Sequence, residues 1–183
     1  MKPLLAVLYR EGKIRATNQI FIFWDVAYPL LYLLVFGVAM ERAMGFTVPG
    51  ISVSYNAFFL AGVLGMASFA IASNTAWSFF MDRDNGIFYE MLTSPMTRGQ
   101  YLLGKVLFNI VVALVQALIT VVLGALFLGV PLRVTGMPWL LAAVIVGTAG
   151  WFFFYAIFAL KIRRNDAFNT VTSVFYFVFL FAS

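Results

Sequence analysis

Hydrophobic residues along this chain fall into five long runs, separated by short polar segments. The runs cover about Ile20–Met40, Ala57–Phe80, Tyr101–Leu128, Trp139–Leu160 and Ala167–Ser183. The first four are long enough for a helix to cross a bilayer, which takes roughly 20 apolar residues, and the last lies at the low end of that range. The pattern therefore predicts an all-α fold, a polytopic transmembrane helical bundle.

Positive charge alternates between the polar segments. The N-terminal segment carries four Lys or Arg residues, and the fourth loop carries three. Three more, Arg83, Arg98 and Lys105, lie in the second loop and the first turns of the run that follows it, whereas the first and third loops carry one each. Because Lys and Arg of short loops are retained in the cytoplasm, we predict a multi-pass protein of the cell inner (plasma) membrane with a cytoplasmic N-terminus. We expect these bases to meet anionic lipid headgroups of the inner leaflet.

Composition narrows the function classes. The chain is 63% hydrophobic and only 10% charged, against about 25% charged in soluble domains. Its net charge of +5 does not indicate nucleic acid, since the bases flank membrane runs rather than form one patch. The chain has no Cys and no His, which removes thiol chemistry and the commonest zinc and haem ligands. We expect neither a metal site nor catalytic residues.

The N-terminal segment, residues 1–17, mixes apolar and charged residues. Leu4 and Leu8 begin an apolar stripe that Glu11 interrupts one turn later. We interpret the segment as a short helix lying on the inner membrane surface, with a solvated tail as the alternative. Asn18 can cap the helix that follows, and Pro29 can kink it.

Polar residues inside the apolar runs can have a structural or a functional role. Asp25 lies near the start of the first run, where a pair with Arg15 is favoured over a transport role. Asn109 and Gln116 are favoured as interhelical hydrogen-bonding residues, with a lining role on a transport path as the alternative. The second run is dense in small residues, which let neighbouring helices approach closely. These are Gly62, Gly65, Ala67, Ser68, Ala70, Ala72 and Ser73.

The second loop, residues 81–100, contains its own short amphipathic segment. Acidic residues and Asn85 precede it, which favours a helix start, and Pro95 disfavours helix at the residue before it. Between these limits the apolar residues recur at helical spacing on one face. They are Ile87, Phe88, Met91 and Leu92.

Such a helix has too few turns to be stable alone in water, so its apolar face must pack on something. One interpretation is a groove on a soluble partner. The other is the bilayer or the base of the chain's own bundle. A form of capping box, Thr97 to Gln100, then begins the next run.

This loop resembles that of the permease subunits of ABC-2-type exporters, in particular those that export drugs, oligosaccharides or polysaccharides. The resemblance rests on the order R-x-x-G-x-x-x-E-x-L-x-S-P followed by Y-x-x-G-K. The matching residues are Arg83, Gly86, Glu90, Leu92, Ser94, Pro95, Tyr101, Gly104 and Lys105. Further likenesses in the N-terminal segment and before the last run extend it over essentially the whole chain, 1–183.

The resemblance implies six spans per subunit, two permease subunits and a separate ATP-hydrolysing subunit that grips the short loop helix. On this reading Ile87, Phe88, Met91 and Leu92 fill the ATPase groove, Glu90 pairs with a base there, and Pro95 ends the helix. The expected coupling residues are Arg83, Gly86, Ile87, Phe88, Glu90, Met91, Leu92, Ser94 and Pro95. Since five of six spans are present, we expect a C-terminally truncated product, the alternative being a fifth helix that just reaches the outer surface.

The sequence has no G-x-x-x-x-G-K-[ST] phosphate-binding loop. We therefore expect ATP and Mg²⁺ to bind the partner ATPase and not this chain, with a second permease subunit completing a homodimer. Two other functions stay open. One is a non-transporting structural or assembly membrane protein. The other is a membrane-embedded enzyme, for which Asp25 is the sole candidate acid within a run.

Overall fold

A computed structural model describes residues 3–37, 55–131 and 134–182, with the side chains of residues 21, 92 and 180–182 outside that description. Every element in these ranges is helical. The elements are α1 (Pro3–Thr17), α2 (Gln19–Tyr32), the π-helical turn η1 (Leu33–Gly37), α4 (Tyr55–Asp84), α5 (Ile87–Thr93), α6 (Arg98–Leu128), the 3₁₀ turn η2 (Val134–Gly136), α7 (Met137–Lys161) and α8 (Asn165–Ala182). The all-α prediction is confirmed for the part of the chain described.

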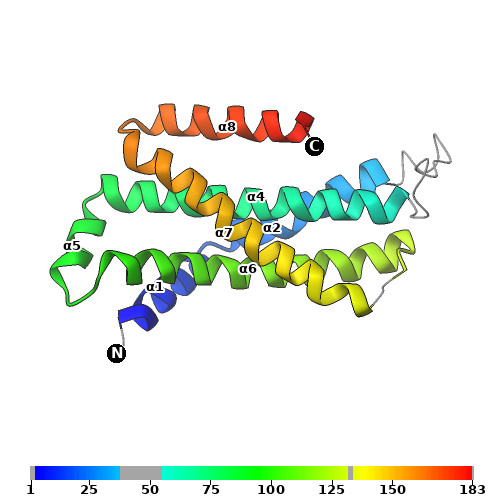
Figure 1. Cartoon of the computed structure of the whole chain (residues 1–183), viewed down its shortest axis with the longest axis horizontal. Coiled ribbons are helices and arrows are strands. Elements are labelled where there is room, and N and C mark those ends of the chain that lie inside the picture. Colours follow the sequence, from blue (N-terminus) through cyan, green and yellow to red (C-terminus); the bar gives the residue numbers. More distant parts are fainter. Residues whose placement is uncertain (1–2, 38–54, 132–133, 183) are drawn as a thin grey trace.

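The long helices form a bundle in which α4, α6 and α8 run lengthwise and α7 crosses them obliquely (Figure 1). The most extensive helix pair is α4 with α7, and α1 packs mainly on α6. The short helix α5 lies at one end of the bundle, between α4 and α6 (Figure 1). This end also holds α1, so the two short helices share it.

In the described part of the chain, three helices are long and apolar enough to cross a membrane. They are Tyr55–Asp84, Arg98–Leu128 and Val134–Lys161, and a fourth span results if α1 and the helix after it form one broken span bent by 69°. The structure thus supports a membrane protein with three to four spans among the described residues. The five predicted spans are not all confirmed: the first runs beyond residue 37, and α8 does not meet the same criterion.

Local sequence signals predicted some helix ends better than others. The predicted capping box is present, with Gln100 N donating to Thr97 Oγ1 and Thr97 N donating to Gln100 Oε1. Asn18 occupies the N-cap position of α2, but its side chain makes no capping hydrogen bond. Pro29 lies within α2, and the π-helical turn begins four residues after it. The missing backbone donor of Pro29 leaves the carbonyl of Asp25, one turn earlier, without its helical partner.

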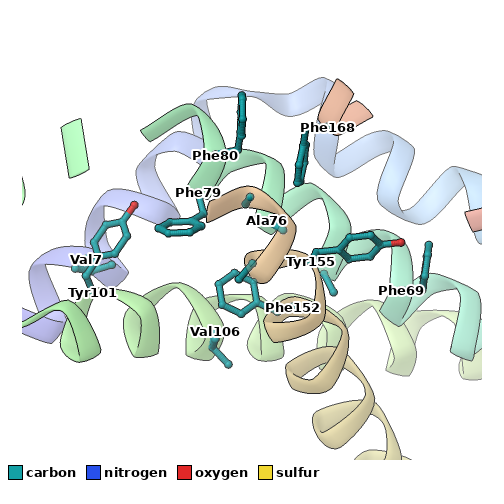
Figure 2. Packing of buried hydrophobic residues seen from close by; sticks show 13 residues of the cluster. Val7, Phe69, Ala76, Phe79, Phe80, Tyr101, Val106, Phe152, Tyr155 and Phe168 are labelled. Atoms are coloured by element: carbon teal, nitrogen blue, oxygen red, sulfur yellow. The ribbon is translucent and has the colours of Figure 1, made fainter. Parts of the chain in front are cut away.

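The core divides into an aromatic half and an aliphatic half. The aromatic half joins α1, α4, α6, α7 and α8 and includes Phe80 stacked on Phe168, with ring centroids 5.1 Å apart (Figure 2). The aliphatic half lies around Leu33, Leu60 and Val121. Small residues of α4 contribute as predicted at Ala72, which is fully buried, whereas Gly62 and Gly65 are exposed.

Close packing of α4 predicts a difference between two alanines of that helix. Ala72→Leu should destabilise the protein by about 1–3 kcal/mol, because a larger side chain does not fit a fully buried site. Ala61→Leu is the matched control, since Ala61 is exposed on the same helix. The midpoint of thermal unfolding in detergent should fall for the first variant only; equal midpoints would contradict this packing.

Candidate functional site

A fully buried lysine lies where α1, α4 and α6 meet. Lys105 on α6 is 0% exposed, and its Nζ lies 2.9 Å from Glu11 Oε1 and 2.9 Å from Asp82 Oδ2. It also donates to Ser78 Oγ at 2.9 Å. A buried ammonium is strongly unfavourable when unpaired. Lys105 is tolerated here because two carboxylates and a hydroxyl surround it.

Arg10 and Tyr101 extend this arrangement. Arg10 binds both carboxylate oxygens of Asp82, at 3.0 and 2.6 Å, and Glu11 Oε1 at 3.0 Å. The Tyr101 hydroxyl donates to Asp82 Oδ2 at 2.5 Å. Burial lowers the pKa of Arg10, but the hydrogen bond and charge of Asp82 outweigh it, so that this pKa lies above its ordinary value. We call Arg10, Glu11, Asp82, Tyr101 and Lys105 the ion cluster; its two cations balance two carboxylates.

A glycine beside the ion cluster sets how closely α1 approaches α6. A Cβ on Gly104 would lie 2.7 Å from Val7 Cγ1 and 2.8 Å from Val7 Cβ. Val7 itself is fully buried (Figure 2). Only glycine fits opposite Val7. The close approach of the two helices places Glu11 within reach of Lys105, the residue after Gly104.

The predicted loop helix is present as α5. Gly86 precedes it with φ of 77°, a left-handed conformation that other residues adopt only with strain. Ser94 is extended at its C-terminal end, as expected for a residue before Pro95. The Ser94 hydroxyl also donates to the Met91 carbonyl at 2.5 Å. Gly86, Ser94 and Pro95 thus set the start and the end of α5.

The apolar face of α5 packs on the chain's own bundle. The Phe88 ring centroid lies 5.7 Å from that of Phe79 and 5.3 Å from that of Tyr101, and Met91 packs against the same core. For these two residues the structure shows the alternative packing, not a free face awaiting a partner. Phe79 and Tyr101 provide an aromatic surface that the loop pattern alone did not reveal.

The outward side of α5 is more polar. Tyr89 is 61% exposed, and Glu90 is also exposed, while Ile87 is half-buried. The side chain of Leu92 lies outside the described residues. Among the described side chains of α5, Tyr89 and Glu90 therefore belong to a surface that another protein can reach.

Arg83, also expected to contact a partner, instead caps α7. Its guanidinium donates to the carbonyls of Ala159 and Ile162 and lies over the Phe80 ring, 5.1 Å from its centroid. The last carbonyls of a helix lack intrahelical partners, and a cation there is also favoured by the helix dipole. Arg83 therefore ties the end of α4 to the end of α7.

The polar residues predicted within the first and third apolar runs lie outside the ion cluster and have partners of their own. Asp25 forms the expected ion pair with Arg15. Gln116 Nε2 donates to the Asp25 carbonyl at 2.5 Å, which links α6 to α2. Asn109 instead donates to the Lys105 carbonyl of its own helix at 2.7 Å. Gln116 and Asn109 line different pockets, and a transport path that passes them stays a prediction.

The ion cluster contains residues that sequence reasoning missed. In the sequence Glu11 interrupts an apolar stripe and Asp82 belongs to the acidic residues before a helix, whereas the structure buries both against Lys105. Arg10 is one of the flanking bases in the sequence pattern. One signal was available: Lys105 stands within the third apolar run and requires a counter-ion. Among the described residues, no group of three or more acids is placed to hold a metal ion.

The model of one protein family, the ABC-2 type transporter, matches residues 3–183 of this sequence. The chain belongs to the ABC-2 type transporter family. Within this ABC-2 type transporter, α5 and two members of the ion cluster, Tyr101 and Lys105, fall among the motif residues Arg83 to Lys105 that carried the resemblance.

Relatives of this ABC-2 type transporter are also named as transport permeases. A protein named "Putative transport permease ycf38" from Cyanophora paradoxa is 29% identical over 108 residues, 58% of this chain and 37% of that protein. Proteins of the same name from Pyropia yezoensis and Porphyra purpurea are each 30% identical over 105 residues, 57% of this chain and 35% of their own length. The chain thus matches about a third of the length of these curated relatives. No solved structure matches it.

The ion cluster predicts a strong effect of removing its central charge. Lys105→Met should cost about 3–5 kcal/mol, because it leaves an excess of buried negative charge. Lys13→Met is the control, since Lys13 is exposed on α1. Thermal unfolding and the rate of chymotrypsin cleavage after Tyr9, which is exposed on α1, would report loss of α1 docking.

A double variant distinguishes the effect of unpaired charge from the effect of changed side-chain shape in the ion cluster. Adding Glu11→Leu to Lys105→Met leaves Arg10 paired with Asp82 and restores charge balance, so stability should recover in part. A double variant less stable than Lys105→Met alone would contradict the assignment of the cost to unpaired charge.

Gly104→Ala tests the close approach of the two helices. The new methyl group meets Val7 at under 3 Å, so we expect destabilisation of about 1–3 kcal/mol and faster cleavage after Tyr9. Gly99→Ala is the matched control on α6, because a Cβ there meets nothing within 4 Å. Alanine favours helix over glycine, so this control should be neutral or slightly stabilising.

Proposed function

We propose that this chain is the membrane-spanning permease subunit of an ATP-driven exporter in the cell inner (plasma) membrane. Family membership and the names of its relatives support a transport permease. In this proposal ATP and Mg²⁺ bind a separate ABC ATPase subunit, and a second copy of the permease completes the path. The N-terminus is cytoplasmic, α1 lies in the membrane surface, and α2 with η1 and α8 add two further spans.

In this proposal α5 makes the contact with the ATPase. Its apolar residues Phe88 and Met91 already pack on the bundle, so instability of a short helix no longer argues for a partner. What supports the contact is the exposure of Tyr89 and Glu90 on a helix held firmly from behind. Glu90 suits a basic residue of the ATPase, and Tyr89 supplies apolar area with a polar tip.

The observation that carries the proposal is a continuous set of contacts from α5 to three other helices. Phe88 contacts the ring of Tyr101, and the hydroxyl of Tyr101 donates to Asp82. Asp82 in turn binds Arg10 on α1 and Lys105 on α6. A displacement of α5 therefore acts at once on α1, α4 and α6.

Energy transfer through such contacts requires two states of the ATPase that bind α5 differently. A ligand or partner shifts an equilibrium only by the difference between its affinities for the two states. The exposed face of α5 supplies the binding, and the ion cluster supplies the rigid attachment. In this way ATP hydrolysis on the partner drives rearrangement of the spans without any phosphate site on this chain.

The exposed face of α5 gives a direct test. Tyr89→Ala with Glu90→Lys should abolish co-purification of the ATPase subunit in the full-length complex, while the midpoint of thermal unfolding stays unchanged. Both side chains lie outside the core, so the permease itself should fold normally. Asp166→Lys is the control, since Asp166 is an exposed acid at the start of α8.

Retained ATPase binding by the Tyr89/Glu90 variant would contradict the contact. If no ATPase co-purifies with the unaltered protein either, a non-transporting structural role gains support instead. Phe88→Asp is not suitable as the main variant, because it disturbs packing on Phe79 and Tyr101 within the chain.

Tyr101→Phe tests the link between α5 and the ion cluster. The substitution keeps the ring that Phe88 contacts and removes the hydrogen bond to Asp82, which is worth about 1.5–3 kcal/mol for a charged acceptor. We expect normal ATPase binding but weaker coupling, seen as transport into inverted vesicles that falls more than ATP hydrolysis does. Equal transport per ATP hydrolysed would show that the Tyr101 hydroxyl takes no part.

A further inference from the structure

One residue of α4 is shared by three neighbouring pockets. Asn74 lines a pocket of about 350 Å³ with α2 and α6, one of about 220 Å³ with α8, and one of about 150 Å³ with α1 and α6. The side chain of Asn74 is exposed and makes no hydrogen bond among the described residues. An asparagine within an apolar run that has no partner among the described residues is a candidate for binding a ligand.

The largest of these pockets combines an apolar wall with amide groups. Trp24, Tyr28 and Tyr32 line it from α2, and Ala67 and Ala70 leave room on α4. Aromatic rings with polar tips suit a molecule that is apolar at one end and hydrated at the other. The volume lies within the usual range of small-molecule sites, about 300–1,000 Å³.

A second polar group of this pocket has unused hydrogen-bonding capacity. Gln116 is 4% exposed and lines the pocket. Its Nε2 donates to the Asp25 carbonyl, but its Oε1 has no hydrogen-bond partner. A buried amide oxygen without a donor is costly, and a bound hydroxyl group would satisfy it after a small rotation of the side chain.

Charged side chains around the pockets are already balanced within the chain. Asp25 pairs with Arg15, and Glu11 pairs with Arg10 and Lys105. No ligand charge is needed to neutralise them, and a charged ligand would lose its hydration without gaining a counter-ion. In the pocket between α2, α4 and α6 the remaining polar groups are amides and hydroxyls, which match a ligand that both donates and accepts hydrogen bonds.

We propose that the pocket between α2, α4 and α6 binds an uncharged amphipathic molecule whose polar end carries hydroxyl groups. Asn74 and Gln116 bind the hydroxyl end, and the rings of Trp24, Tyr28 and Tyr32 pack against the apolar body. The inference rests on the proposed function, because such a ligand is the class of molecule that the permease would export. Asn74 and Gln116 then determine specificity rather than perform chemistry.

Photolabelling of the full-length complex in nanodiscs tests this assignment. The probes are three octyl compounds with the same diazirine in the chain and different ends: a glucoside, a phosphate and a trimethylammonium. We expect the glucoside alone to label peptides of α2 and α4 saturably. Asn74→Leu and Gln116→Leu should each raise the glucoside concentration that gives half-maximal labelling about tenfold, as the loss of one buried hydrogen bond implies.

Asn169→Leu is the matched control, since Asn169 is an exposed asparagine of α8 that lines none of these three pockets. ATPase co-purification is measured on the same samples. It shows that each variant is folded, and its loss in the unaltered protein would count against the proposed function rather than against the pocket. Normal ATPase binding with equal labelling by all three probes would overturn the ligand class. Labelling that occurs only when the permease copies are separated would show that a second copy fills the pocket.

Discussion

The burial of the Lys105 ammonium is the constraint on which the base of this molecule depends. A cation removed from water is acceptable only where carboxylates meet it, and those carboxylates come from two other helices. The charge therefore determines which residues of α1, α4 and α6 must lie opposite one another. Apolar packing alone would allow these helices to slide, because lipid and neighbouring helix offer similar apolar surroundings. We interpret the ion cluster mainly as a device that fixes helix register.

Arg83 extends the same principle to α7. Its guanidinium takes up carbonyls that the end of α7 leaves without partners. Together with the ion cluster, this contact connects α1, α4, α6 and α7 at the end of the bundle that carries α5. A short helix that would be unstable in isolation thus stands on a base held by hydrogen bonds and ion pairs. Phe88 and Met91 attach α5 to that base, which leaves its polar side free for recognition.

Sequence reasoning succeeded where the signal was local or periodic. The long helices follow from hydrophobic runs, the start of α6 from the Thr97–Gln100 pair, and the limits of α5 from the acidic residues and Asn85 before it and from Pro95 after it. The partners of charged residues were harder to predict, because Glu11 and Lys105 lie far apart in the sequence and no helical periodicity relates them. The Arg15–Asp25 pair could be predicted because the two residues lie only ten positions apart in the sequence.

The two ends of the bundle are held by different kinds of contact. Ion pairs and a helix cap hold the end near α5, whereas the end near Leu33, Leu60 and Val121 is aliphatic. Directional contacts resist a change of geometry, while aliphatic side chains exchange neighbours at little cost. A force applied at α5 would then leave the helix bases locked in place and spread the opposite ends. The helices would then change their separation mainly at the aliphatic end of the bundle.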